Sequence, residues 1–165
     1  MRISIFILLI AFCVATKSND LFKTMEFKSD QGGFQFQAPI DWTYRQVQGV
    51  DSYVGEIISG QKDTLHFDMG RYSPPLDHPL YRNKSDEDDE ENYKSKVTWK
   101  NINGHSAKFS YHWTKTKSDY GVYFDSLWTG DDSDKIKLTI YGFNLSKKTK
   151  TQLITAVQSI KFIRN

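Results

Sequence analysis

Residues 96–113 read KVTWKNINGHSAKFSYHW. In the middle of this stretch, Asn103-Gly104 separates two segments rich in β-branched and aromatic residues. Asn-Gly between two such segments is the strongest short-range signal for a hairpin, because both residues tolerate a positive φ. The stretch therefore predicts two antiparallel strands. The rest of the chain is expected to supply the packing partners for their apolar face.

Two loop lengths are compatible with this turn. A two-residue loop places Ile102 opposite His105 and Trp99 opposite Lys108, which mixes apolar and polar side chains on each face. A three-residue loop, 102–104, instead sets Trp99 opposite Ala107. Because a slip of one residue moves every side chain to the other face, the hydrophobic pattern should select the register. We therefore predict the three-residue loop.

This register divides the side chains of the hairpin between two faces. The face predicted to join the core carries Val97, Trp99, Ala107, Phe109, Tyr111 and Trp113. The face predicted to meet water or a partner carries Ser106, Lys108, Ser110 and His112. Any functional site should then lie on the second face or in the loop that precedes the hairpin.

The N-terminal residues 1–15, MRISIFILLIAFCVA, have the layout of a secretory signal peptide. Arg2 precedes an apolar segment, and Cys13 and Ala15 are small residues at the −3 and −1 positions of a cleavage site. At 1.5 Å per residue the segment is too short to span a hydrocarbon core of roughly 30 Å. An uncleaved anchor is the alternative. We predict export to the periplasm or the medium, with no integral membrane segment after cleavage.

Residues 16–165 are predicted to form a single domain. Removing 15 of the 165 residues leaves 150, enough for one core, and removes the only cysteine. Disulfides and thiolate-bound metals are therefore excluded from the mature chain. Losing Arg2 leaves 21 basic residues against 20 acidic ones, so no basic excess favours nucleic acid as a partner. We expect a monomer without a cofactor.

The middle of the chain shows the alternation of β-strands, and a helical period replaces it near the C-terminus. Ser146 is a good N-cap for a helix over residues 147–159, where Leu153 and Val157 recur at helical spacing. Residues 159–163 read as a closing strand, and residues 19–28 as a helical turn. Besides the hairpin, strands are predicted at 34–38, 44–48, 53–59, 64–72, 120–129 and 135–143.

Residues 73–95 interrupt this pattern. Prolines open the segment, and the acidic run DEDDEE occupies positions 86–91. A block of like charges repels itself and favours a solvated loop. A calcium site is the alternative, but calcium loops space their ligands and place a glycine at the turn, and this run does neither.

The strand region begins with a strand and turn of the pattern F-x-F-x-A-P-x-x-W, which runs from Phe34 to Trp42. It ends with a helix that runs into S-I-K-F (159–162). Together with the strands between them, these features resemble the PsbP/Mog1-like superfamily. The resemblance implies an α+β fold, in which an antiparallel sheet of six or seven strands is covered by helices as an α/β/α sandwich. Its motifs concern packing, so it implies no catalytic residues.

The chain offers few candidates for chemistry. Of its four histidines, His66 shares one face of a predicted strand with Asp68, which makes this pair the best candidate for a metal or small ligand. His105 and His112 lie seven apart, on opposite faces of one strand. No nucleophile elbow, zinc-protease, P-loop or dinucleotide motif occurs, so we expect no catalytic residues.

Aromatic residues raise a further possibility, a stacking surface for carbohydrate or lipid. We assign Trp99 and Trp113 to the core and expect Trp42, just after a proline turn, to be exposed. The other candidates for such a surface are Tyr44, Tyr123 and Trp128.

Two functions follow. The first is a non-catalytic exported protein that binds an unknown protein partner or assists an assembly. The second is a small-ligand or metal-binding domain using His66 and Asp68, and an enzyme ranks third.

Overall fold

The computed structural model describes residues 22–77, 93–129 and 135–164. The predicted signal peptide, the acidic run and most of the 73–95 loop lie outside these residues. Within the described ranges, ten strands form two antiparallel sheets, of seven and three strands, with one helix. The prediction of an α/β/α sandwich is therefore wrong, whereas that of an antiparallel sheet is confirmed.

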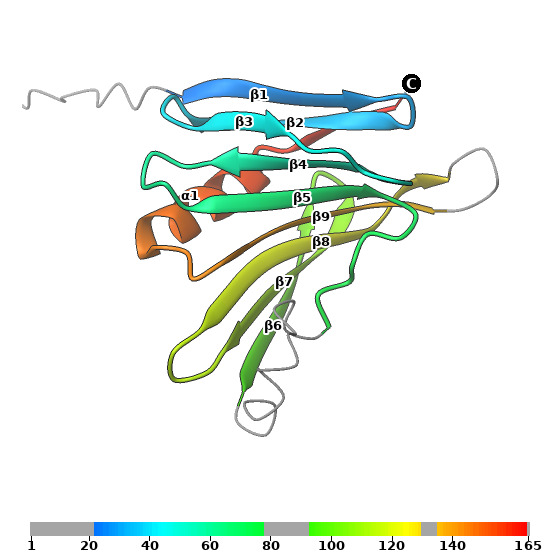
Figure 1. Cartoon of the computed structure of the whole chain (residues 1–165). Coiled ribbons are helices and arrows are strands. Elements are labelled where there is room, and N and C mark those ends of the chain that lie inside the picture. The colour runs from blue at the N-terminus through cyan, green and yellow to red at the C-terminus, as the bar shows by residue number, and fades with distance from the viewer. Residues whose placement is uncertain (1–21, 78–92, 130–134, 165) are drawn as a thin grey trace, which may run out of the picture.

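The larger sheet has the strand order β3-β4-β5-β9-β8-β7-β6 and curves from one edge to the other (Figure 1). Its strands are β3 (Thr43–Gln46), β4 (Tyr53–Ile58), β5 (Thr64–Gly70), β6 (Lys94–Ile102), β7 (His105–Trp113), β8 (Ser118–Thr129) and β9 (Lys135–Phe143). Strand β8 lies inside the sheet, and its neighbouring residues Val122, Tyr123 and Phe124 are all buried. Because consecutive residues of a strand point to opposite faces, β8 is covered on both faces.

The smaller sheet has the order β1-β2-β10, from β1 (Phe22–Ser29), β2 (Gly32–Pro39) and β10 (Lys161–Ile163). The prediction of a helical turn at 19–28 is wrong over its described part. Met25 and Phe27 are buried, while Thr24 and Glu26 between them are exposed, which is the period of a strand. With β2 available as a partner, this alternation outweighs the weaker helical spacing.

Phenylalanine rings join the two sheets. Phe34 of β2 stacks on Phe27 of β1 at 4.7 Å between ring centroids, and meets Phe67 of β5 edge-on at 5.2 Å. All three rings are almost fully buried. The small sheet therefore covers the β3–β5 end of the large sheet.

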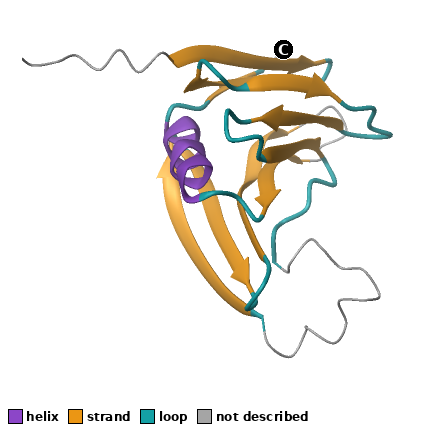
Figure 2. Ribbon diagram, turned by 60° about the vertical axis from the view of Figure 1, so that its left-hand side comes forward, coloured by secondary structure: helices purple, strands orange, loops and turns teal. Residues whose placement is uncertain are grey.

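Helix α1 (Lys147–Gln158) lies on the same side of the large sheet as the small sheet (Figure 2). Ser146 is its N-cap, as predicted, and its Oγ accepts a hydrogen bond from the Thr149 backbone N–H at 3.2 Å. The buried side chains of Leu153 and Val157 join the core, so the helix packs on the sheet through its apolar stripe. Among the described residues no helix is long and apolar enough to cross a membrane.

The other face of the large sheet is crossed by residues 73–77. Pro74 O accepts a hydrogen bond from Thr139 Oγ1 at 2.7 Å, and Pro75 O accepts one from Lys108 Nζ at 2.8 Å. Leu76 is buried there. A short extended segment thus lies where the sandwich prediction placed a helical layer. It also buries Lys108, Ser110 and His112, so the prediction that these side chains meet water is wrong.

The hairpin has the register that we rejected. Ile102 pairs with His105 and Trp99 with Lys108, around a two-residue loop. Asn103 (φ 50°) and Gly104 (φ 86°) both have the positive φ that such a turn requires. The hydrophobic pattern failed to select the register because β6 is an edge strand, exposed along its whole length except at Ile102. Because almost no side chain of β6 is buried, the geometry of the turn set the register.

We expect Gly104→Ala to lower the free energy of unfolding by about 1–2 kcal/mol, because a Cβ is disfavoured at this φ although the space around it is open. Gly104→Asn should cost less, since asparagine tolerates the left-handed region. Chemical denaturation of the three proteins measures both effects. An alanine variant as stable as the parent would contradict the assigned turn.

Candidate ligand-binding site

His66 and Asp68 lie on the same face of β5 but have different neighbours. His66 Nδ1 is 3.7 Å from Glu56 Oε1, and its ring stacks on Tyr141. Asp68 Oδ1 accepts a hydrogen bond from Ser73 Oγ at 2.9 Å. Burial lowers the pKa of His66 and raises the pKa of Asp68. No group of three potential metal ligands occurs in the described ranges, so metal binding by this pair stays a prediction.

Ser110, His112 and Asp119 share the opposite end of that face. His112 and Asp119 are directly opposite each other on β7 and β8, and His112 Nε2 lies 3.2 Å from Leu76 O. Ser110 Oγ has no hydrogen-bond partner among the described residues. A serine nucleophile needs a base within hydrogen-bond distance, so this row of residues is not a catalytic triad as it stands.

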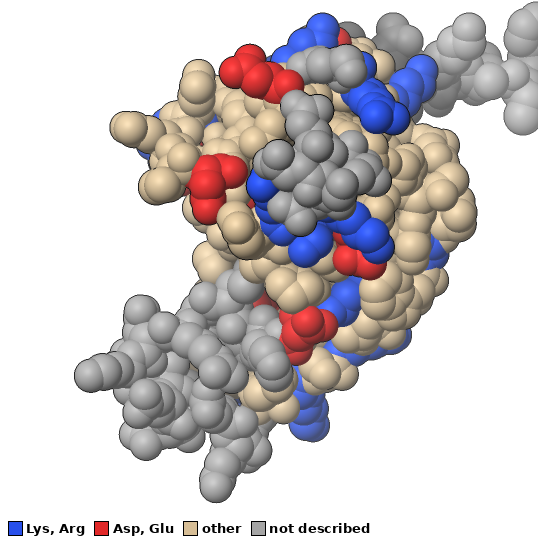
Figure 3. All heavy atoms as spheres, turned by 90° about the vertical axis from the view of Figure 1, so that its right-hand side faces the viewer, with Lys and Arg blue, Asp and Glu red and all other residues tan. Residues whose placement is uncertain are grey.

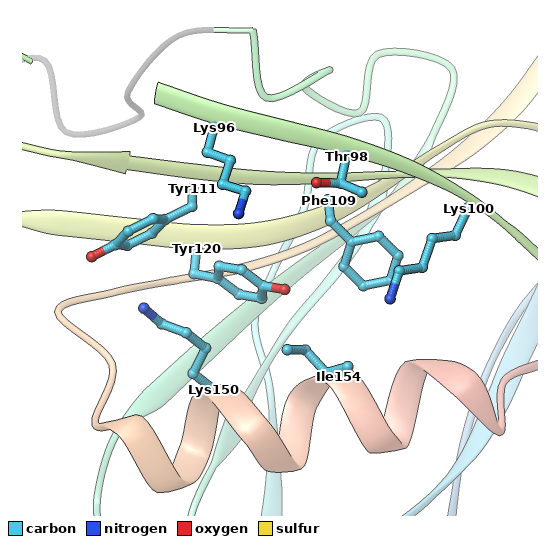
Figure 4. A pocket seen from close by; sticks show the side chains of 8 residues that line it. All are labelled: Lys96, Thr98, Lys100, Phe109, Tyr111, Tyr120, Lys150 and Ile154. Carbon is cyan, nitrogen blue, oxygen red and sulfur yellow. The ribbon is translucent and has the colours of Figure 1, made fainter. Parts of the chain in front are cut away.

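A pocket of about 290 Å³ lies on the other face of the large sheet, between α1 and strands β6 to β8 (Figure 4). The pairing of β6, β7 and β8 brings together side chains at positions 96–100, 109–111 and 120, and the helix supplies one wall. The lining residues are Lys96, Thr98, Lys100, Phe109, Tyr111, Tyr120, Lys150 and Ile154.

The inner wall of the pocket is aromatic. Lys150 Nζ lies 3.9 Å from the centroid of the Tyr111 ring and 5.4 Å from that of Tyr120. Lys100 Nζ lies 5.3 Å from the centroid of the Phe109 ring. These are cation–π distances, so the rings hold two of the amines at the pocket. The two tyrosine rings are themselves neighbours, with centroids 6.2 Å apart.

The pocket is strongly positive. Three amines line it, and among the described residues no carboxylate does. Within the described part of the chain, Lys96, Lys100 and Lys150 take part in no ion pair. Burial raises the pKa of Tyr120 to about 12, so its hydroxyl stays neutral and offers no compensating charge. Like charges gathered without a counter-charge favour the binding of an anion.

Positive and negative side chains are interleaved on one face of the molecule. On the face shown in Figure 3, lysines and arginines alternate with acidic residues among uncharged ones. The formal net charge of the chain is only +2, so three amines at one pocket exceed the net charge of the whole chain.

Sequence patterns did not reveal this site. Lys96 and Lys100 share a face with Phe109 and Tyr111 only in the two-residue register, which we did not predict. The sequence did not distinguish Lys150 from the other lysines near the C-terminus. The one available signal was that helix α1 has no acidic residue in its first turn, where acidic residues are favoured.

The burial of several aromatic side chains differs from the prediction. Trp99 is 56% exposed on the edge strand β6, and Trp42 is fully buried, so both predictions are wrong. Trp113 is partly buried and stacks on Tyr111 at 4.6 Å, beside the pocket. Tyr123 is buried, and Tyr44 is partly exposed at the far end of the sheet.

The chain matches no family model and no curated protein. The resemblance to the PsbP/Mog1-like superfamily stays a prediction, and the sandwich architecture that it implied is wrong.

Proposed function

We propose that this protein is an exported, non-catalytic binding protein whose pocket receives a carboxylate or similar anion attached to an apolar group. The observation that carries the proposal is a set of three amines around an aromatic wall, none of which forms an ion pair with a described residue. The amines supply charge-assisted hydrogen bonds to the anion, and the rings offer apolar surface to the group that carries it.

Size restricts the ligand further. A volume of about 290 Å³ is at the lower end of ligand pockets, so a single ring or a short acyl chain fits better than a large cofactor. The pocket contains no paired base and nucleophile among its lining residues, which favours binding over catalysis. Export is supported by the signal-like residues 1–15.

Titration followed by amide NMR tests the proposal, with benzoate and octanoate as anions and benzyl alcohol as a neutral probe. We expect the anions to shift amides of β6, β7 and α1, and to bind roughly tenfold more tightly than the alcohol. Lys150→Ala should lower the affinity for the anions by about fivefold to tenfold, because the amine is partly buried over the rings.

Lys148→Ala is the matched control, since Lys148 is an exposed lysine on the same helix turn and does not line the pocket. Added salt should lower the affinity for the anions and leave the affinity for the alcohol unchanged. Equal affinities for benzoate and benzyl alcohol, or an unchanged affinity in Lys150→Ala, would rule the proposal out.

A further inference from the structure

Strand β6 has no partner strand along one of its edges among the described residues. It is the terminal strand of the large sheet, and within the described residues it pairs only with β7. The two-residue turn makes Ile102 and His105 a hydrogen-bonded pair. Such pairs alternate along an antiparallel ladder, so the backbone N–H and C=O groups of Val97 and Trp99 point away from β7. The edge therefore offers a row of donors and acceptors for another strand.

The two faces of this edge strand carry different chemistry. Lys96 and Lys100 lie on the pocket face, while Val97 and Trp99 lie on the other. Val97 is 44% exposed and Trp99 is 56% exposed. Lysines on an edge strand commonly prevent unwanted pairing, but exposed valine and tryptophan have the opposite effect. This combination fits an edge that excludes some strands and accepts others.

We propose that an extended segment of a partner protein adds to β6 as a strand, with acidic and apolar side chains in alternation. Its acidic side chains face Lys96 and Lys100, and its apolar side chains between them pack on Val97 and Trp99. The inference rests on the proposed function, because it makes an acidic side chain of the partner the anion that the pocket receives. Lys150 then meets that anion from the helix.

Charge decides between this partner and a second copy of the chain. Pairing of β6 with another β6 brings lysines of the two copies together on the pocket face, and like charges opposite each other on a sheet are unfavourable. An acidic strand has the complementary charge along the same edge. The lysines thus discriminate against self-association and in favour of an acidic partner.

Two labelled eight-residue peptides, alternating glutamate with valine or lysine with valine, test this partner by fluorescence anisotropy. We expect the glutamate peptide to bind and to shift the emission of Trp99, and the lysine peptide not to bind. The double variant Lys96→Glu, Lys100→Glu should lose about tenfold in affinity for the glutamate peptide and gain a similar factor for the lysine peptide. Because that exchange requires binding by the variant, it separates a changed charge from a misfolded protein.

Two controls define the mode of binding. The double variant Lys115→Glu, Lys148→Glu alters the net charge by the same amount, but at exposed lysines outside the edge. It should leave the affinities for both peptides unchanged. A glutamate peptide methylated on alternate backbone nitrogens keeps its side chains but cannot pair as a strand, so it should not bind. Tight binding of the methylated peptide would overturn strand addition.

The outcomes also separate the two proposals. If benzoate binds in a Lys150-dependent manner and the glutamate peptide does not bind, strand addition is wrong and the pocket remains an anion site. If neither benzoate nor the peptide binds, both proposals are wrong. A peptide that binds but shows no charge exchange in the double variant would overturn the assigned partner chemistry.

Discussion

Phe34→Ala is expected to lower the free energy of unfolding by about 3–5 kcal/mol, the range for truncating a buried phenylalanine. The Phe34 ring is fully buried between the two sheets, stacked on Phe27 and edge-on to Phe67. Removing it leaves a cavity at the only place where β2 rings meet β5 rings in the described core. Neighbouring rings that are held by two sheets cannot move far to fill that cavity.

Chemical denaturation measures this loss, and Phe22→Ala is the matched control. Phe22 is the same residue type on the adjacent strand β1, but 47% of it is exposed, so its truncation should change stability by no more than about 0.5 kcal/mol. Similar losses in the two variants would show that Phe34 does not hold the sheets together.

Trp42→Ala should have a comparable effect, about 3–5 kcal/mol. The indole is fully buried and packs edge-on against Phe36 at 6.4 Å between ring centroids. A turn places it there, because the Trp42 backbone N–H donates to Pro39 O at 3.0 Å and folds the chain back over β2. Truncation would empty the space under this turn.

Two other variants sharpen the measurement on Trp42. Trp42→Phe should cost less than about 1.5 kcal/mol, since it keeps most of the apolar volume and removes an indole N–H that has no hydrogen-bond partner among the described residues. Trp99→Ala, at an exposed tryptophan, should change stability by about 0.5 kcal/mol or less. A large loss in Trp99→Ala with a small one in Trp42→Ala would restore the assignment that the structure corrects.

Local patterns predicted most of the elements. The alternation at 135–143 corresponds to β9 (Lys135–Phe143), and the helix at 147–159 differs from α1 by one residue. The Asn103-Gly104 turn lies where expected, and Ser146 caps the helix. These features depend on neighbours along the chain, where residue type restricts φ and ψ or satisfies a free N–H group directly.

Architecture could not be predicted in the same way. The β1 segment carries both a helical and a strand-like spacing, and only its pairing with β2 selects the strand. The segment 73–77 looked like a solvated loop, yet Thr139 and Lys108 from distant strands hold it on the sheet. Both outcomes depend on partners remote in the sequence, whose positions no local pattern contains.

The hairpin at residues 96–113 separates these two kinds of information. Its sequence alone determined that two strands meet at Asn103-Gly104, because those residues accept the positive φ of a tight turn. Tertiary structure decided that β6 is an edge strand with almost nothing to bury, and this left the register of the two strands to the turn. It also decided that Lys150 joins Lys96 and Lys100 at the pocket, because only the packing of α1 on the sheet brings this third amine over the Tyr111 ring.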